Sequence, residues 1–72
     1  MPSQTCAEVC MVAVNEAFRD NLKNTFKMLM DAMIMANGED AAIQEAVAKA
    51  ANGVALSKLT YDKSKELIAN LQ

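Results

Sequence analysis

Two cysteines are the residues of this chain whose type and spacing could do chemistry. Cys6 and Cys10 stand four positions apart, so in a helix they share one face, with Cβ atoms about 5–6 Å apart. That separation exceeds the mean of about 3.8 Å in disulfides, so a bond between them would distort the helix. Two thiolates could instead hold a metal if a second copy supplied two more, or the thiols could be redox-active. We favour the simpler interpretation that both are small residues in a helical interface, with metal binding by Cys6 and Cys10 as an alternative.

Other catalytic arrangements are absent from the sequence. There is no histidine, hence no Ser-His or Cys-His pair, and the two glycines are too far apart to form a phosphate-binding loop. The neighbouring carboxylates Glu39 and Asp40 are expected at the start of a helix, and Asp62 and Glu66 on an exposed face. No pocket is evident that would adapt them to acid–base catalysis. We therefore predict no enzymatic activity and no cofactor.

Three basic residues recur at four-residue spacing: Arg19, Lys23 and Lys27. Such a row beside Phe18 and Phe26 could bind RNA, but the helical period places both phenylalanines on the predicted inner face. Nearby acidic residues dilute the charge and can pair with it locally; they are Glu16, Asp20 and Asp31. A solvated helix face is the favoured interpretation.

Composition limits the class of protein. The chain has 72 residues, of which 53 % are hydrophobic and 22 % charged, as in a small globular domain and unlike a disordered chain. A net charge of −2 argues against binding nucleic acid through bulk charge. Two cysteines are too few for a secreted disulfide scaffold, and residues 1–5 lack the basic start of a secretory signal. We expect a soluble, cytoplasmic protein without a membrane span.

Helix signals divide the chain into two long segments. Thr5 and Glu8 have the spacing of a capping box, and Asn37-Gly38 is typical of a helix end. We therefore predict a helix over residues 6–36, a turn at 37–39 and a second helix over about 40–70. The expected fold is a single all-α domain over residues 1–72, an antiparallel helical hairpin.

The second helix has an alternative interpretation. Asn52-Gly53 repeats the turn signal, and Thr60 could cap a short third helix. We favour one bent helix, because an interior glycine costs only about 1 kcal/mol relative to alanine. Glu45 and Lys49, four positions apart, are predicted to form a surface ion pair.

Apolar residues at spacings of three and four predict the inner faces of both helices. In the first helix the stripe is Met11, Val14, Phe18, Leu22, Phe26, Leu29, Met33 and Ala36. In the second it is Ile43, Val47, Ala50, Val54, Tyr61 and Ile68, with Ser57 and Ser64 in the same phase.

A hairpin has one internal interface, so apolar residues elsewhere stay exposed. The candidate interface residues are Met28, Met30, Met33, Ile34, Met35, Leu56, Leu59 and Leu67. We expect them to drive association, first as a dimer of hairpins in a four-helix bundle, with a helical protein partner or a filament as alternatives. The predicted function is a non-enzymatic structural or protein-interaction subunit. The alternatives are a metal-binding or thiol-redox protein and a small RNA-binding regulator.

Overall fold

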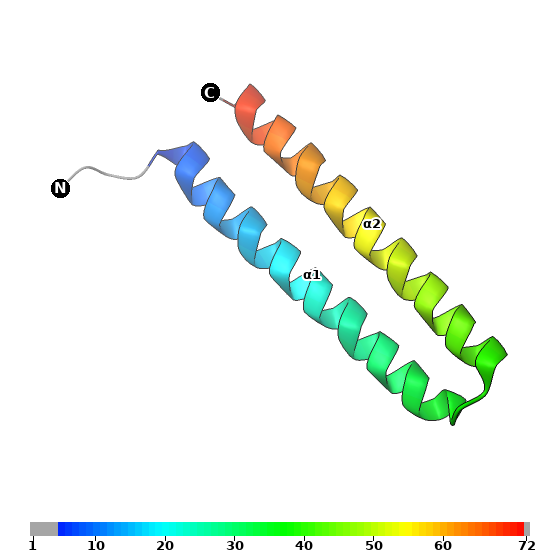
Figure 1. Ribbon diagram of the computed structural model, residues 1–72. Coiled ribbons are helices and arrows are strands. Elements are labelled where there is room, and N and C mark those ends of the chain that lie inside the picture. Colours follow the sequence, from blue (N-terminus) through cyan, green and yellow to red (C-terminus); the bar gives the residue numbers. More distant parts are fainter. Residues whose placement is uncertain (1–4, 72) are drawn as a thin grey trace.

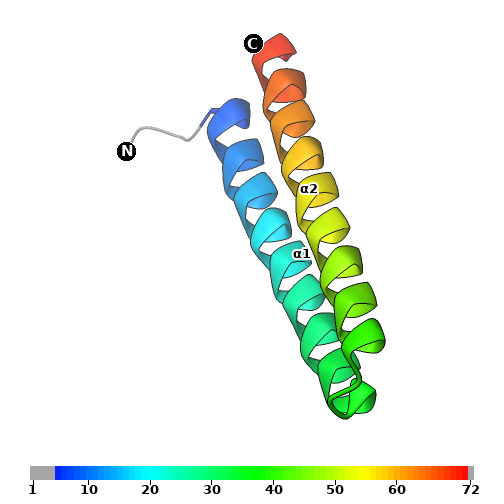
Figure 2. The same cartoon turned by 45° about the vertical axis from the view of Figure 1, so that its right-hand side comes forward.

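A computed structural model describes residues 5–71, which form two antiparallel helices joined by a tight turn (Figure 1). Helix α1 spans Cys6–Ala36 and α2 spans Asp40–Asn70, the bounds predicted from the sequence. The helices lie side by side along their length in both Figure 1 and Figure 2. The predicted all-α hairpin is confirmed, and it is a single layer of two helices, only 8 Å thick between its outermost Cα atoms.

Local signals account for both ends of α1. The Thr5 hydroxyl accepts a hydrogen bond from the Glu8 backbone N–H at 3.1 Å, which satisfies one of the free donors of the first turn. At the other end the chain leaves the helix through two left-handed residues, Asn37 at φ 49° and Gly38 at φ 83°. The Asn37 N–H donates to the Ile34 carbonyl, as expected of a helix C-cap.

Gly38 is expected to be sensitive to substitution for a backbone reason alone. Nothing lies within 4 Å of a Cβ placed there, so Gly38→Ala meets no steric obstacle, but φ 83° is unfavourable for alanine. We expect a loss of about 1 kcal/mol in the free energy of unfolding, measured by urea denaturation at fixed protein concentration. Ala36→Gly at the helix end serves as a comparison. An unchanged midpoint for Gly38→Ala would contradict the described turn.

The inner face of α1 differs from the predicted stripe at two positions. Phe26 is 52 % exposed and Met33 is also exposed, while Thr25 and Ala32 are half-buried in their place. Two packed helices keep facing positions every 3.5 residues, so their seam alternates steps of three and four. The predicted run of three successive four-residue steps, from Val14 to Phe26, drifts around the helix and leaves the seam.

Small residues of α2 bring the helices close together. Ala46, only 7 % exposed, occupies the seam, whereas the predicted Val47 is exposed. A Cβ on Gly53 would lie 3.1 Å from the Thr25 methyl carbon, so only glycine fits at this separation without a shift. Two helices share a single interface, so the seam buries little: among residues 5–71 only Ala46 and Ile68 are buried.

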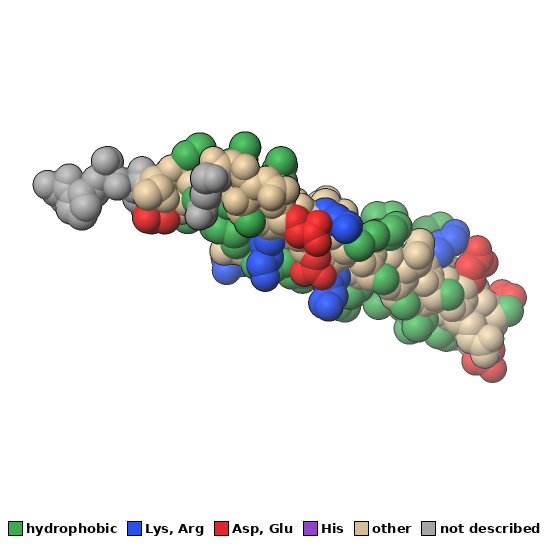
Figure 3. All heavy atoms as spheres, turned by 90° about the horizontal axis from the view of Figure 1, so that it is seen from above, with side chains coloured by type: hydrophobic (Ala, Val, Ile, Leu, Met, Phe, Trp, Pro, Cys, Tyr) green, Lys and Arg blue, Asp and Glu red, His purple; other side chains and the backbone are tan. Residues whose placement is uncertain are grey.

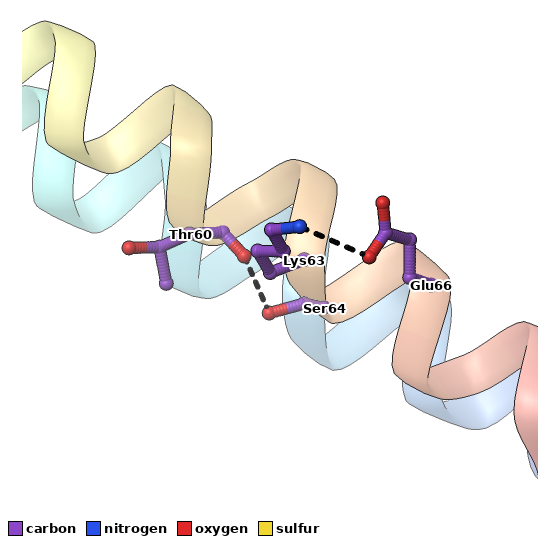
Figure 4. Close-up of polar contacts among 4 residues, drawn as sticks. All are labelled: Thr60, Lys63, Ser64 and Glu66. Carbon is purple, nitrogen blue, oxygen red and sulfur yellow. Dashed lines mark hydrogen bonds and ion pairs between the residues drawn. The ribbon is translucent and has the colours of Figure 1, made fainter.

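Helix α2 continues through Gly53 without a break, so the alternative of a third helix is wrong. Thr60 does not act as a cap: its hydroxyl donates to the Leu56 carbonyl at 2.8 Å. Ser64 repeats the bond one turn later, donating to the Thr60 carbonyl at 2.8 Å (Figure 4). Both hydroxyls are satisfied by the helix that contains them.

Residues 1–4, which enter the prediction that the chain has no secretory signal, lie outside the described residues. Within residues 5–71, neither helix includes a stretch long and apolar enough to cross a membrane.

Candidate interaction surfaces

Large hydrophobic side chains lie at the surface of the hairpin along most of its length (Figure 3). All eight candidate interface residues are exposed in the structure: Met28, Met30, Met33, Ile34, Met35, Leu56, Leu59 and Leu67. No side chain among the described residues is fully buried. Two helices in one layer have no second layer to cover these groups, so their exposure follows from the fold itself.

The exposed residues do not share one face. Met28 lines a hollow between the two helices, together with Ala32 of α1 and Lys49 of α2. Met30 and Ile34 instead line a groove that belongs to α1 alone. The sequence pattern therefore identified exposed residues correctly but combined at least two surfaces into one.

The groove on α1 lies between two ridges of side chains with four-residue spacing, and its volume is about 860 Å³. One ridge is apolar and consists of Phe18, Leu22, Phe26, Met30 and Ile34. The other is polar and mostly basic: Asn15, Arg19, Lys23, Lys27 and Asp31. Grooves between such ridges are where packed helices insert their own side chains. We call this surface the Phe26 groove.

The basic residues of the Phe26 groove have no ion-pair partner within residues 5–71. The local pairs that the spacing allows, Lys23 with Asp20 and Lys27 with Asp31, do not form. The ion pairs found among residues 5–71 both lie on α2. The predicted surface pair of Glu45 and Lys49 is confirmed, at 3.2 Å. A second pair joins Lys63 and Glu66 at 3.4 Å (Figure 4). Both are exposed and contribute little to stability.

One polar and aromatic cluster was missed at the sequence level. The rings of Phe18 and Tyr61 lie 4.6 Å apart, centroid to centroid. The Tyr61 hydroxyl donates to the Asn15 side-chain oxygen at 2.7 Å, and the Lys65 ammonium lies 5.4 Å from the Tyr61 ring centroid. Tyr61 was predicted to face inward, but its partners on α1 depend on how the two helices align, which periodicity does not report.

Cys6 and Cys10 lie together at the start of α1 as thiols. Their sulfur atoms are 3.9 Å apart and within hydrogen-bonding distance, well beyond the roughly 2.05 Å of a disulfide. The hydrogen bond to Cys6 raises the pKa of the Cys10 thiol, and partial burial raises it further. Within residues 5–71 no group of three or more metal-ligating side chains is found, so any metal at Cys6 and Cys10 would need ligands from elsewhere.

Cys10 is expected to react faster with alkylating agents when Cys6 is replaced. Only the thiolate is alkylated by iodoacetamide, so a raised pKa of the Cys10 thiol slows its reaction at pH 8. We expect Cys6→Ala to accelerate alkylation of Cys10, as measured by peptide mass spectrometry over time. Cys6→Ser, which keeps a hydrogen-bonding group, should give a smaller change. Equal Cys10 rates in all three proteins would contradict the described contact.

No family model, curated protein or solved structure matches this chain.

Proposed function

We propose that this protein is a non-enzymatic helical subunit, acting in the cytoplasm as a scaffold or adaptor, that assembles with further helices through its exposed apolar surface. The carrying observation is that large hydrophobic side chains are exposed on more than one side of a hairpin whose own seam buries only Ala46 and Ile68 among residues 5–71. A second copy is the simplest partner, because two hairpins form the two layers of a four-helix bundle.

The energetics favour assembly over a lone hairpin. Met28, Ile34 and Met35 each expose most of their side chain to water. Covering one such residue contributes about 1.5–3 kcal/mol, which is comparable to the 3–5 kcal/mol that a whole core of this size supplies. Association thus changes stability by as much as folding of the isolated chain does.

The experiment is a mass measurement on a double variant. Met30→Glu with Met35→Glu places carboxylates on two exposed positions of α1 and leaves the seam untouched. We expect the wild type to sediment as an assembly and the variant to shift towards the 7.8 kDa monomer. A fully helical variant with the mass of the wild-type assembly would refute association through this surface.

A second candidate function, RNA binding, is supported by one specific observation. Arg19, Lys23 and Lys27 are without ion-pair partners in residues 5–71 and border a groove in which Phe26 is half-exposed. Three phosphate contacts to single-stranded RNA predict a slope of about −2 for log K against log salt concentration. The change of all three residues to Gln should abolish binding to a single-stranded RNA probe. Binding that persists in this triple variant would refute the candidate.

A further inference from the structure

The two broad sides of the hairpin differ in how their charges are paired. On one side Met28 and Met35 of α1 are seven residues apart and so share a face, as do Lys49 and Leu56 of α2. Met28 and Lys49 line the same hollow, of about 300 Å³, which brings the two sets onto one side of the molecule. Leu67 extends this side because it follows Leu56 by three turns of helix. We call this surface the Met28 face.

The charged groups of the Met28 face are paired. Lys63 follows Leu56 by seven residues and so shares its face, and its ammonium lies 3.4 Å from the Glu66 carboxylate. The hollow of this face is lined by Ala, Gly, Thr, Met and Leu residues together with one charged residue, Lys49. The Lys49 ammonium is already bound to the Glu45 carboxylate along the same helix. A second, smaller hollow lies nearer the end of the hairpin opposite the turn. It is lined by uncharged residues, among them Asn21, Ser57 and Thr60. Burying this side therefore requires no charged group to lose its partner.

The opposite side carries two basic groups, Arg19 and Lys65, that have no ion-pair partner among residues 5–71. It contains Tyr61 with the Lys65 ammonium over its ring, and Asn15, whose side chain accepts the Tyr61 hydrogen bond. Arg19 follows Asn15 by one turn and lines the Phe26 groove with it. In a two-fold dimer the same patch meets itself, so copies docked through this side would bring like charges together.

We propose that the Met28 face is where a second copy of this chain docks, forming a two-layered bundle of four helices. The inference rests on the proposed function and adds to it the surface that is used. Each helix has 31 residues and is therefore about 46 Å long, and two helices side by side are about 20 Å wide. One face of the hairpin thus has an area of about 900 Å². A stable interface needs about 800 Å² from each partner, so one face of the hairpin suffices.

The shape of the Met28 face fits the same occupant. Its hollow is lined by small residues of the seam, among them Ala46, Ala50 and Gly53, and by the long side chain of Met28. Large apolar side chains from the facing copy can enter this space, and interiors packed at protein density leave no hollow of this size empty. Met28, Met35, Leu56 and Leu67 of each copy are the residues that become buried.

The test compares two leucines of α2 that differ in face and in little else. Leu56 is 54 % exposed and belongs to the Met28 face, whereas Leu59 is 53 % exposed and lies on the outer edge of α2. Leu56→Glu occurs twice in a dimer and buries two charges, so we expect the dimer Kd to rise at least about 100-fold. Leu59→Glu should change it less than about threefold. Sedimentation equilibrium over a range of concentrations gives both constants.

A second matched pair guards against unfolding as the explanation. On α1, Met28→Glu is expected to dissociate the dimer, while Ile34→Glu, at a position of similar exposure in the Phe26 groove, is expected to retain it. Circular dichroism on the control variants shows whether a glutamate at an exposed helical position is tolerated. Helical, dimeric controls beside dissociated Leu56→Glu and Met28→Glu variants support the proposal.

The contradicting outcomes are distinct. If the wild type associates but Leu59→Glu or Ile34→Glu dissociates it and Leu56→Glu does not, the Met28 face is the wrong surface and the proposed function stands. If the wild type is monomeric at every concentration, self-assembly and the docking face both fail.

Discussion

Gly53→Leu is expected to lower the free energy of unfolding by about 1–3 kcal/mol. A Cβ at this position lies 3.1 Å from the Thr25 methyl carbon and 3.3 Å from its hydroxyl oxygen, so a larger side chain must push the helices apart. The loss should exceed the gain of about 1 kcal/mol that replacing a helical glycine brings. Urea denaturation at one fixed protein concentration measures the difference.

The matched control for Gly53 uses a smaller change on both helices. Gly53→Ala gains helix propensity but meets the Thr25 methyl group, so we expect little net effect. Thr25→Ser removes that methyl group and keeps the hydroxyl that donates to the Asn21 carbonyl at 2.9 Å. In this background Gly53→Ala should stabilise by up to about 1 kcal/mol. Additive effects of the two substitutions would show that the helices do not touch here.

Tyr61→Ala is expected to cost about 2–3 kcal/mol, the largest loss from any single truncation in the open half of the hairpin. It removes the ring packed at 4.6 Å on Phe18, the hydrogen bond to Asn15 and the contact with Lys65. Truncating a fully buried aromatic costs about 3–5 kcal/mol, and Tyr61 is only half-buried, so we expect a smaller loss.

Tyr61→Phe separates the ring from the hydroxyl. It keeps the stacking on Phe18 and loses only the hydrogen bond to Asn15, which is worth about 0.5–1.5 kcal/mol. Asn15→Ala should cost a similar amount, and the Tyr61→Phe and Asn15→Ala double variant no more than either alone. A Tyr61→Phe variant as unstable as Tyr61→Ala would contradict a role for the ring in joining the helices.

Local signals were sufficient to predict both ends of α1. A capping hydroxyl at Thr5 and the left-handed pair Asn37-Gly38 act within a few residues, and both work in the structure as the sequence predicts. The continuity of α2 was a closer decision. Gly53 carries a turn signal, but its neighbours are good helix formers. In the structure the Thr25 side chain of α1 occupies the space that a side chain on Gly53 would need.

The inner face could be predicted only in part, for a geometric reason. Counting at 3.6 residues per turn put Phe26 inside, while the seam between two helices repeats every 3.5 residues and takes Thr25 instead. A phase error of one residue decided whether Phe26 belongs to the core or to a groove with Arg19 and Lys23. The contacts of Tyr61 with α1 depend on how the two helices align along their length, which the periodicity of the sequence does not predict.

Sedimentation equilibrium of the wild-type protein under reducing conditions, from low to high micromolar concentration, tests directly whether the hairpin assembles. Exposed apolar residues on a hairpin without a second layer predict a reversible dimer, with a limiting mass of twice 7.8 kDa. A mass of 7.8 kDa at every concentration, with full helicity, would show that the hairpin is not one half of a larger assembly.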